Sequence, residues 1–301
     1  MPGLPAWNER AMIETMDRLG ISTAMLSISS PGVHFGDDVA ARLLARTVNA
    51  EGARLKAAHP GRIGFLASLP LPDVEGALAE IAGAMDELGA DGVILESNSG
   101  GVYPGDPRFD PVYVELNRRS AVVLLHPTSP HCPSCSLSGP DLPAPILEFM
   151  FETTRAVTNL LLTRCLDRYP QIRFIIPHGG ATIPVLVDRI TMAASFLPTM
   201  AGFSPEAILA SLNRLYFDLA GTPLPRLLPA LDTFADPTRL LYGTDWPFTP
   251  EAAVARLLHQ LQAALSADGA DAAAIFGGNA RRLFSHVPTR PTATNHHGPR
   301  R

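Results

Sequence analysis

The chain has 301 residues, 46% of them hydrophobic and 18% charged, with a formal net charge of -5 at pH 7. It contains no run of the roughly 18 or more apolar residues that a membrane span requires, and its first residues lack the features of a signal peptide. Lysine and arginine form no cluster, which argues against nucleic acid and membranes as partners. The composition therefore favours one large cytoplasmic domain that acts on a small molecule.

Apolar, strand-like runs alternate with segments of helical periodicity, which is the pattern of parallel βα units. A first helix is predicted over residues 8–19, with Gly20 as its stop signal. Seven strands are predicted after it, at residues 23–29, 63–69, 92–96, 122–126, 174–178, 215–219 and 240–245. A helix is predicted behind each strand, at residues 38–58, 74–88, 111–118, 146–168, 183–195, 225–234 and 251–265.

Seven strands preceded by a helix indicate an α/β fold of the (β/α)8 TIM-like barrel type that lacks its first strand in this chain. If the strand ending at Asp245 is the eighth, the helix over residues 8–19 is the one that should follow strand one. We predict a barrel domain over residues 1–286. Residues 287–301 are poor in apolar side chains and are predicted to form a disordered tail.

Three predicted strands end in side chains that bind metals. Asp245 closes an apolar run between Gly243 and Pro247, His126 precedes a proline, and His178 precedes two glycines. Active sites of such barrels lie at the C-terminal ends of the strands, so the three side chains indicate a metal site with His178 as a general acid or base. A buried core histidine and a packed glycine turn are the alternatives for His126 and His178. An aspartate at the end of a buried strand is costly without a metal, a cation or donors.

Other polar residues lie at the same predicted end of the barrel. Asp218 is a candidate for supporting the site, and Glu96 with the polar loop behind it is either a substrate contact or a turn. Cys132 and Cys135 have the spacing of a zinc or redox pair. Because no second pair of ligands accompanies them, we interpret them as loop cysteines.

The order of these motifs resembles the amidohydrolase-related, metal-dependent decarboxylases that include aminocarboxymuconate semialdehyde decarboxylase. The resemblance extends from about Trp7 to Phe284, and a segment between the predicted strands at 92–96 and 122–126 is most similar to the 6-methylsalicylate and γ-resorcylate decarboxylase branch. The motifs are Trp7-Asn8, Met16-Asp17, residues 27–32, Asp106 to Phe109, Glu115 to Arg119, His126-Pro127, His178-Gly179-Gly180, Arg189-Ile190 and Gly243 to Phe248.

This resemblance implies a homodimeric barrel with a divalent metal, zinc by preference and manganese or magnesium as alternatives. His126 and Asp245 match the family's metal ligands on its fifth and eighth strands. His178 matches the histidine that works beside the metal, so the resemblance gives His178 and Asp245 catalytic roles. No organic cofactor is implied. The family's first strand supplies two further ligands in a His-x-His or Glu-x-His motif, which is absent from this sequence.

Two hypotheses account for that departure: Met1 is internal to a longer natural polypeptide, or the chain is a truncated, impaired paralogue. The first is preferred because every other site residue is retained. The expected activity is metal-dependent, nonoxidative decarboxylation of a small hydroxylated aromatic acid of the salicylate type. Alternatives are a metal-dependent hydrolase of a lactone or amide on the same barrel, and a catalytically dead barrel that serves as an interaction subunit.

Overall fold

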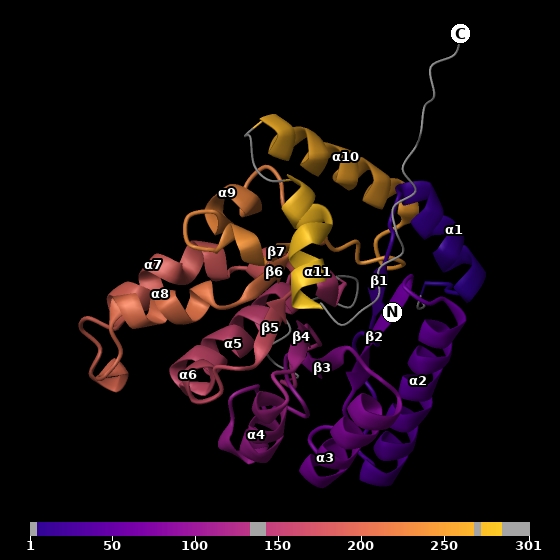
Figure 1. Cartoon of the computed structure of the whole chain (residues 1–301). Coiled ribbons are helices and arrows are strands. Elements are labelled where there is room, and N and C mark those ends of the chain that lie inside the picture. The colour runs from indigo at the N-terminus through magenta and orange to yellow at the C-terminus, as the bar shows by residue number, and fades with distance from the viewer. Residues whose placement is uncertain (1–4, 133–142, 268–271, 285–301) are drawn as a thin grey trace.

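The computed structural model describes residues 5–132, 143–267 and 272–284. Within these ranges seven parallel strands lie side by side in chain order, and helices surround the curved sheet (Figure 1). Each strand is joined to the next by a crossover segment, as the alternating sequence pattern predicts. The strands are β1 (Ala24–Leu26), β2 (Ile63–Ser68), β3 (Gly92–Glu96), β4 (Val122–His126), β5 (Arg173–Ile176), β6 (Tyr216–Asp218) and β7 (Leu240–Leu241).

The helices begin and end largely where the sequence predicts them, because capping residues mark their ends. Asn8 caps α1 and Asp37 caps α2 through side-chain hydrogen bonds to backbone amides. The α-helices are α1 (Glu9–Leu19), α2 (Asp38–Ala58), α3 (Val74–Ala82), α4 (Asp110–Arg118), α5 (Glu148–Leu162), α6 (Cys165–Arg168), α7 (Ile183–Ala193), α8 (Pro205–Asn213), α9 (Leu227–Leu231), α10 (Glu251–Ala267) and α11 (Asn279–Leu283). Short π and 3-10 turns are η1 (Gly83–Glu87), η2 (Pro107–Phe109), η3 (Ala144–Ile146), η4 (His178–Gly180), η5 (Pro198–Met200), η6 (Pro237–Arg239) and η7 (Ala274–Gly278).

Some element boundaries differ from the prediction. The helix predicted over residues 146–168 is two helices, α5 and α6, because Arg164 adopts a left-handed backbone with φ of 56° between them. The helix predicted over 74–88 continues past α3 as the π-helical turn η1. The helices α8 and α11 were not predicted. The sheet, however, contains all seven predicted strands in a single parallel order.

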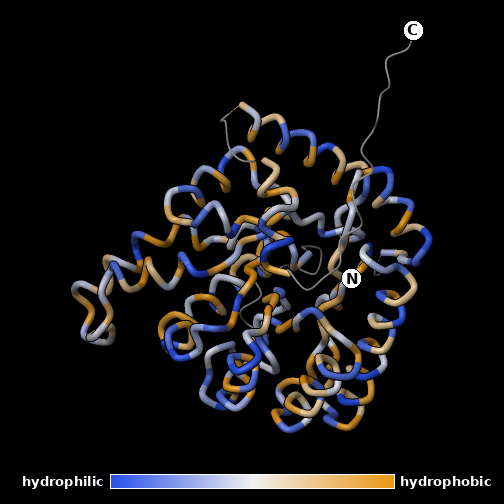
Figure 2. Tube along the Cα trace, in the orientation of Figure 1, coloured by the Kyte–Doolittle hydropathy of each residue, from blue (hydrophilic) through white to orange (hydrophobic). Residues whose placement is uncertain are grey.

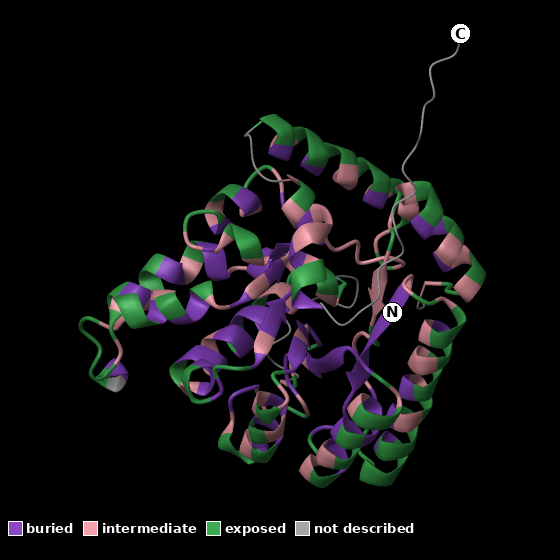
Figure 3. Ribbon diagram, viewed as in Figure 1, coloured by how far each residue is buried: buried purple, intermediate pink, exposed green. Residues whose placement is uncertain are grey.

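Hydrophobic residues run along the strands (Figure 2), and the central strands are largely buried (Figure 3). Their side chains form separate apolar clusters on the two faces of the sheet. Residues such as Phe65, Val93 and Val123 pack outward against the helices. The alternate residues Leu66 and Ile94 face the interior, where they join Leu283 and Phe284 from the end of the described chain, among others. Since side chains alternate along a strand, the even-numbered residues at the end of β3 and β4 share this inner face.

The helix α1 bridges the two ends of the helix layer, between α10 and α2 (Figure 1). Arg18 of α1 makes two hydrogen bonds of 2.6 and 2.7 Å to Glu251 of α10. On its other side, Glu9 accepts a hydrogen bond of 2.7 Å from Arg54 of α2. In the described sheet β1 and β7 are the edge strands, and no pairing joins them. The structure thus confirms a parallel α/β fold consistent with a TIM-like amidohydrolase barrel.

None of the helices in the described ranges combines the length and apolarity of a membrane span. Residues 285–301 and Cys135 lie outside the described residues. Cys132 is disulfide-bonded, which the interpretation of this motif as incidental loop cysteines did not anticipate.

Candidate active site

The three predicted site residues follow three strands of the sheet at the same end. His126 is the last residue of β4, His178 lies two residues beyond β5, and Asp245 lies four residues beyond β7. Asp245 is close enough to both imidazoles that each of them lowers the pKa of its carboxyl group. The structure therefore brings the three residues together, as the sequence predicts.

His126 has a defined tautomer because one ring nitrogen is already engaged. Nδ1–H donates a hydrogen bond of 2.8 Å to the carbonyl oxygen of Pro127, and this leaves the Nε2 lone pair available for a metal. The carboxylate of Glu96 lies on the same Nδ1 side, at 3.7 Å. Burial of the ring opposes protonation, but Glu96, the Pro127 carbonyl and Asp245 together raise the pKa of His126 above its ordinary value.

A glycine turn positions His178 after β5. His178, Gly179 and Gly180 have φ values of 54°, 60° and 80°, in the left-handed region that glycine adopts without strain. Asp218 at the end of β6 anchors this turn, since its Oδ1 accepts a 3.0 Å hydrogen bond from the backbone N–H of His178. The ring atom Nδ1 of His178 is buried and has no hydrogen-bond partner among the described residues. A ligand or substrate group is the natural partner for such an atom.

Asp245 also has a left-handed backbone, with φ of 55°, at a position where aspartate is tolerated. Its Oδ2 accepts a 3.3 Å hydrogen bond from the hydroxyl of Thr249. Burial raises the pKa of Asp245, and the nearby Asp218 raises it further, while His178 and His126 oppose the shift. A carboxyl group with a raised pKa next to two imidazoles has the environment of a proton donor or a metal ligand.

The donor set fits part of a divalent metal site. The free Nε2 of His126 and the carboxylate of Asp245 match two positions of a site with nitrogen and oxygen ligands. Within the described chain, no group of three or more histidine, cysteine, aspartate or glutamate side chains is arranged to hold a metal. His126 and Asp245 therefore supply two ligands, and the remaining coordination positions are left to groups other than the described side chains.

A cavity of about 470 Å³ opens at the ends of β1 to β4, with Glu96 in its wall. Its walls come from the loops that follow these four strands and include Glu96, Asn98 and Thr128. Two contacts tie the loops together: the hydroxyls of Ser30 and Thr128 lie 2.7 Å apart, and the Thr128 N–H donates a 2.9 Å hydrogen bond to Ser97. The cavity therefore has walls that are held in place before any ligand binds.

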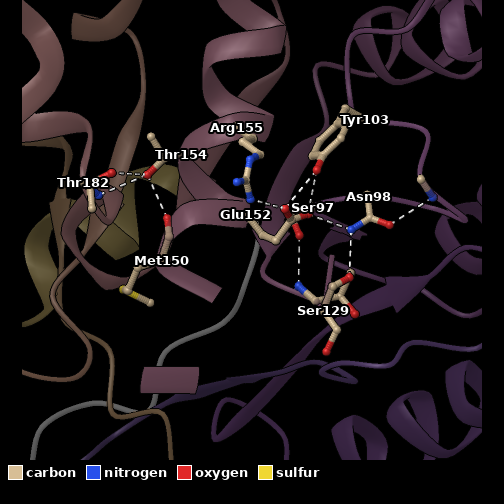
Figure 4. A network of polar contacts seen from close by, with 11 residues as sticks. Ser97, Asn98, Tyr103, Ser129, Met150, Glu152, Thr154, Arg155 and Thr182 are labelled. Carbon is tan, nitrogen blue, oxygen red and sulfur yellow. Dashed lines mark hydrogen bonds and ion pairs between the residues drawn. The ribbon is translucent and has the colours of Figure 1, made fainter. Parts of the chain in front are cut away.

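A buried carboxylate of α5 supports the same walls (Figure 4). Glu152 is 0% exposed and accepts hydrogen bonds from Asn98, Tyr103 and Arg155 at 2.8, 2.9 and 2.8 Å. Asn98 also donates to the carbonyl oxygen of Ser129 in the loop after β4. The network thus connects the loops after β3 and β4 to α5. Sequence reasoning missed it, because nothing in the helical pattern around Glu152 marks that glutamate as buried.

Comparison with known proteins identifies the family of this chain. The sequence profile of the family described as amidohydrolase matches residues 5–285. The chain belongs to the amidohydrolase family. It is 37% identical over 296 residues to a 6-methylsalicylic acid decarboxylase of Aspergillus aculeatus, covering 94% of this chain and 88% of that protein.

Solved structures agree with this assignment. The crystal structure of an amidohydrolase II aligns with a TM-score of 0.85 and 37% identity over 94% of this chain and 90% of that one. A dihydroxybenzoic acid decarboxylase of a Polaromonas species, described with bound manganese and the inhibitor 2-nitroresorcinol, aligns with a TM-score of 0.78 and 25% identity. That alignment covers 94% of this chain and 86% of the Polaromonas protein. The predicted family and its salicylate-type decarboxylase branch are thus confirmed.

Proposed function

We propose that this chain catalyses the nonoxidative decarboxylation of a small hydroxylated aromatic acid of the salicylate type. The observation that carries the proposal is the convergence of His126, His178 and Asp245, with Glu96 between His126 and the cavity. Relatives at 35% and 37% identity are 6-methylsalicylic acid decarboxylases, which gives the substrate class.

A divalent metal would be held by Nε2 of His126 and the carboxylate of Asp245. When bound, the metal acts as a Lewis acid that polarises the substrate's carboxylate and adjacent hydroxyl. The relative described with manganese supports a divalent ion and makes manganese a candidate beside zinc. Metal analysis of the purified protein distinguishes these ions.

The residues of this chain handle the proton in the proposed reaction. Asp245, whose pKa is raised by burial, donates a proton to the ring carbon that bears the carboxylate. The bond from that carbon to the carboxylate then breaks, CO2 leaves, and its bonding electrons restore the aromatic ring. His178, which the Asp218 carboxylate holds through its backbone N–H, orients the acid and returns a proton to Asp245.

Product analysis tests the proposal against its rivals. The metal-loaded protein is incubated with a panel of hydroxybenzoates, lactones and amides, and CO2 and ring-opened products are measured. CO2 with a phenol supports a decarboxylase, whereas ring opening or amide cleavage without CO2 supports the hydrolase. A protein that takes up no metal and converts nothing supports the interaction subunit.

We further propose that a further strand pairs between β7 and β1 and closes an eight-stranded barrel. This strand would be the family's first strand and would supply its two metal ligands. Two observations support this proposal: among the described residues the outer edges of β1 and β7 pair with no strand, and α1 lies between α2 and α10. Detection of a longer polypeptide in the source cells tests it. The family resemblance also leads us to expect a homodimer in the cytoplasm, to be tested by sedimentation and cell fractionation.

A further inference from the structure

The carboxylate of Glu96, at the end of β3, lacks the partners that a buried carboxylate needs. Its Oε2 is buried and has no hydrogen-bond partner in the described structure. The nearest cationic candidate is His126, whose Nδ1 is 3.7 Å away and already donates to Pro127. The loop after β1 covers the other oxygen: a Cβ at Gly32 would lie 3.3 Å from Oε1. The Glu96 side chain is 15% exposed, and a carboxylate that is largely buried in this state is costly unless a ligand supplies donors.

Glu96 is poorly placed to be a further metal ligand. A metal held by His126 would bind Nε2. Glu96 lies beside Nδ1, on the opposite side of the ring. The carboxylate also makes no ion pair with a described lysine or arginine. Metal binding through His126 therefore does not involve this carboxylate, and its only ion pair with a described residue is the 3.7 Å contact with His126.

The cavity offers a better explanation. Glu96 lines it together with apolar side chains that include Leu69, Ile94 and Phe35. The hydroxyl of Ser68, a residue only 4% exposed, also lines the cavity and likewise has no partner in the described structure. Ser68 is paired with Ile94 across β2 and β3, so Ser68 and Glu96 point to the same face. The cavity thus offers apolar side chains together with two unpartnered polar groups, besides polar residues such as His34, Thr128 and His131, which suits an aromatic ring that carries a hydroxyl.

The position of the cavity relative to Asp245 and His178 determines which edge of the substrate's aromatic ring reaches Glu96 and Ser68. Asp245 and His178 follow β7 and β5, whereas the cavity lies at the ends of β1 to β4. A substrate whose carboxylate lies at His126 and Asp245 therefore extends its opposite edge into the cavity. Asn98 is not free to contact it, because its side chain already bonds to Glu152, Ser129 and Gly101.

We propose that Glu96 accepts a hydrogen bond from a ring hydroxyl remote from the carboxylate, with Ser68 as a second contact to that hydroxyl. This inference rests on the proposed decarboxylase function and narrows its substrate class. The preferred substrates are hydroxybenzoates with one hydroxyl beside the carboxylate and a second on the far edge of the ring. Glu96 is then a specificity-determining residue.

The test compares three acids on the manganese-loaded protein: salicylate, and the two dihydroxybenzoates in which a hydroxyl is added ortho or para to the carboxylate. The wild type should prefer the para compound over salicylate by about ten- to hundredfold in kcat/KM, the value of a hydrogen bond to a charged group. In Glu96→Leu, the ratio of kcat/KM for the para compound to kcat/KM for salicylate should fall to about one, because the acceptor for the second hydroxyl is gone. Glu96→Gln keeps a hydrogen-bond acceptor and should retain part of the preference for the para compound. Ser68→Ala should reduce this preference less than Glu96→Leu does.

Glu87→Leu removes an exposed carboxylate that does not line the cavity and is the matched control; the preference should stay as in the wild type. The inference is overturned if folded Glu96→Leu keeps the preference, or if all three acids lose activity equally in both Glu96 variants, which would indicate a role in positioning His126. If the wild type releases CO2 from none of the acids, the proposed function fails. Calorimetric binding of the same acids then decides the role of Glu96: loss of para selectivity in Glu96→Leu supports it, and unchanged selectivity refutes it.

Discussion

The hydroxyl of Tyr103 should stabilise the cavity wall measurably, because its acceptor is a fully buried carboxylate. It donates to both oxygens of Glu152, at 2.9 and 3.1 Å. Tyr103→Phe removes this bond and leaves those from Asn98 and Arg155. A hydrogen bond to a charged group contributes about 1.5–3 kcal/mol. At roughly 2 °C for each kcal/mol in a chain of this size, the variant should melt about 3–6 °C below the wild type.

Thermal and urea unfolding of both proteins measure the effect, with Tyr242→Phe as the matched control. The hydroxyl of Tyr242 makes no hydrogen bond to a described residue, so its removal should change the free energy of unfolding by less than about 0.5 kcal/mol. Burial and the Glu152 carboxylate raise the pKa of Tyr103 to about 12. The difference between Tyr103→Phe and wild type should therefore persist from neutral to mildly alkaline pH.

A double-mutant cycle excludes a nonspecific cause. In the Glu152→Gln background, Tyr103→Phe should cost at least about 0.5 kcal/mol less than in the wild type, because the charged acceptor is gone. Equal costs in both backgrounds, or a Tyr103→Phe melting temperature within about 1 °C of wild type, would refute the claim that this network holds the wall.

Three further outcomes follow from the site and from α1. His178→Gln should lower kcat by about 10²- to 10⁴-fold with little change in KM, as loss of a general acid or base does; steady-state kinetics would show an intact kcat if the histidine only packs. The pKa values of His126 and Asp245 are both raised, so protons compete with the metal for these side chains up to a higher pH than usual. Metal affinity measured by titration should therefore fall as the pH is lowered from 8 to 6. A metal affinity that does not depend on pH would exclude His126 and Asp245 as ligands. Hydrogen bonds from Arg18 and Thr15 lower the pKa of Glu251 to about 2, so its stabilising contribution is present above its unfolded-state pKa of about 4.3 and is lost as pH falls toward 2. Glu251→Gln should therefore reduce the melting temperature at pH 7 and have no effect near pH 2, and an equal effect at both pH values would contradict that reasoning.

The sheet was predictable from the sequence because its strands are buried on both faces. Continuous apolar runs such as Val122 to Leu125 cannot lie at the surface, and their polar ends mark one edge of the sheet. The helix α2 was predicted over its full length, since Asp37 caps it and its apolar positions have helical spacing. The helix α8 was missed although Ser204 and Pro205 carry an N-terminal capping signal.

The site was predictable only in part. His126, His178 and Asp245 each end a strand or follow one closely, so strand order alone brings them together. Glu96 was a candidate because it also ends a strand. Its lack of hydrogen-bond partners, however, depends on how closely the loop that contains Gly32 packs against its carboxylate. Glu152 contacts residues 49 and 54 positions away in the sequence, and such pairings are set by the fold and not by local pattern. Long-range polar contacts of this kind therefore cannot be predicted from the sequence alone.

In the proposed reaction, Asp245 protonates the ring carbon that loses CO2. Turnover of a salicylate-type acid by the metal-loaded protein in D2O tests it most directly, with CO2 and the deuterium content of the phenol measured together. If Asp245 is the proton donor, each CO2 released is accompanied by one deuterium at the carbon that bore the carboxylate, and Asp245→Ala gives neither product. Substantial CO2 release by a folded Asp245→Ala variant would contradict it.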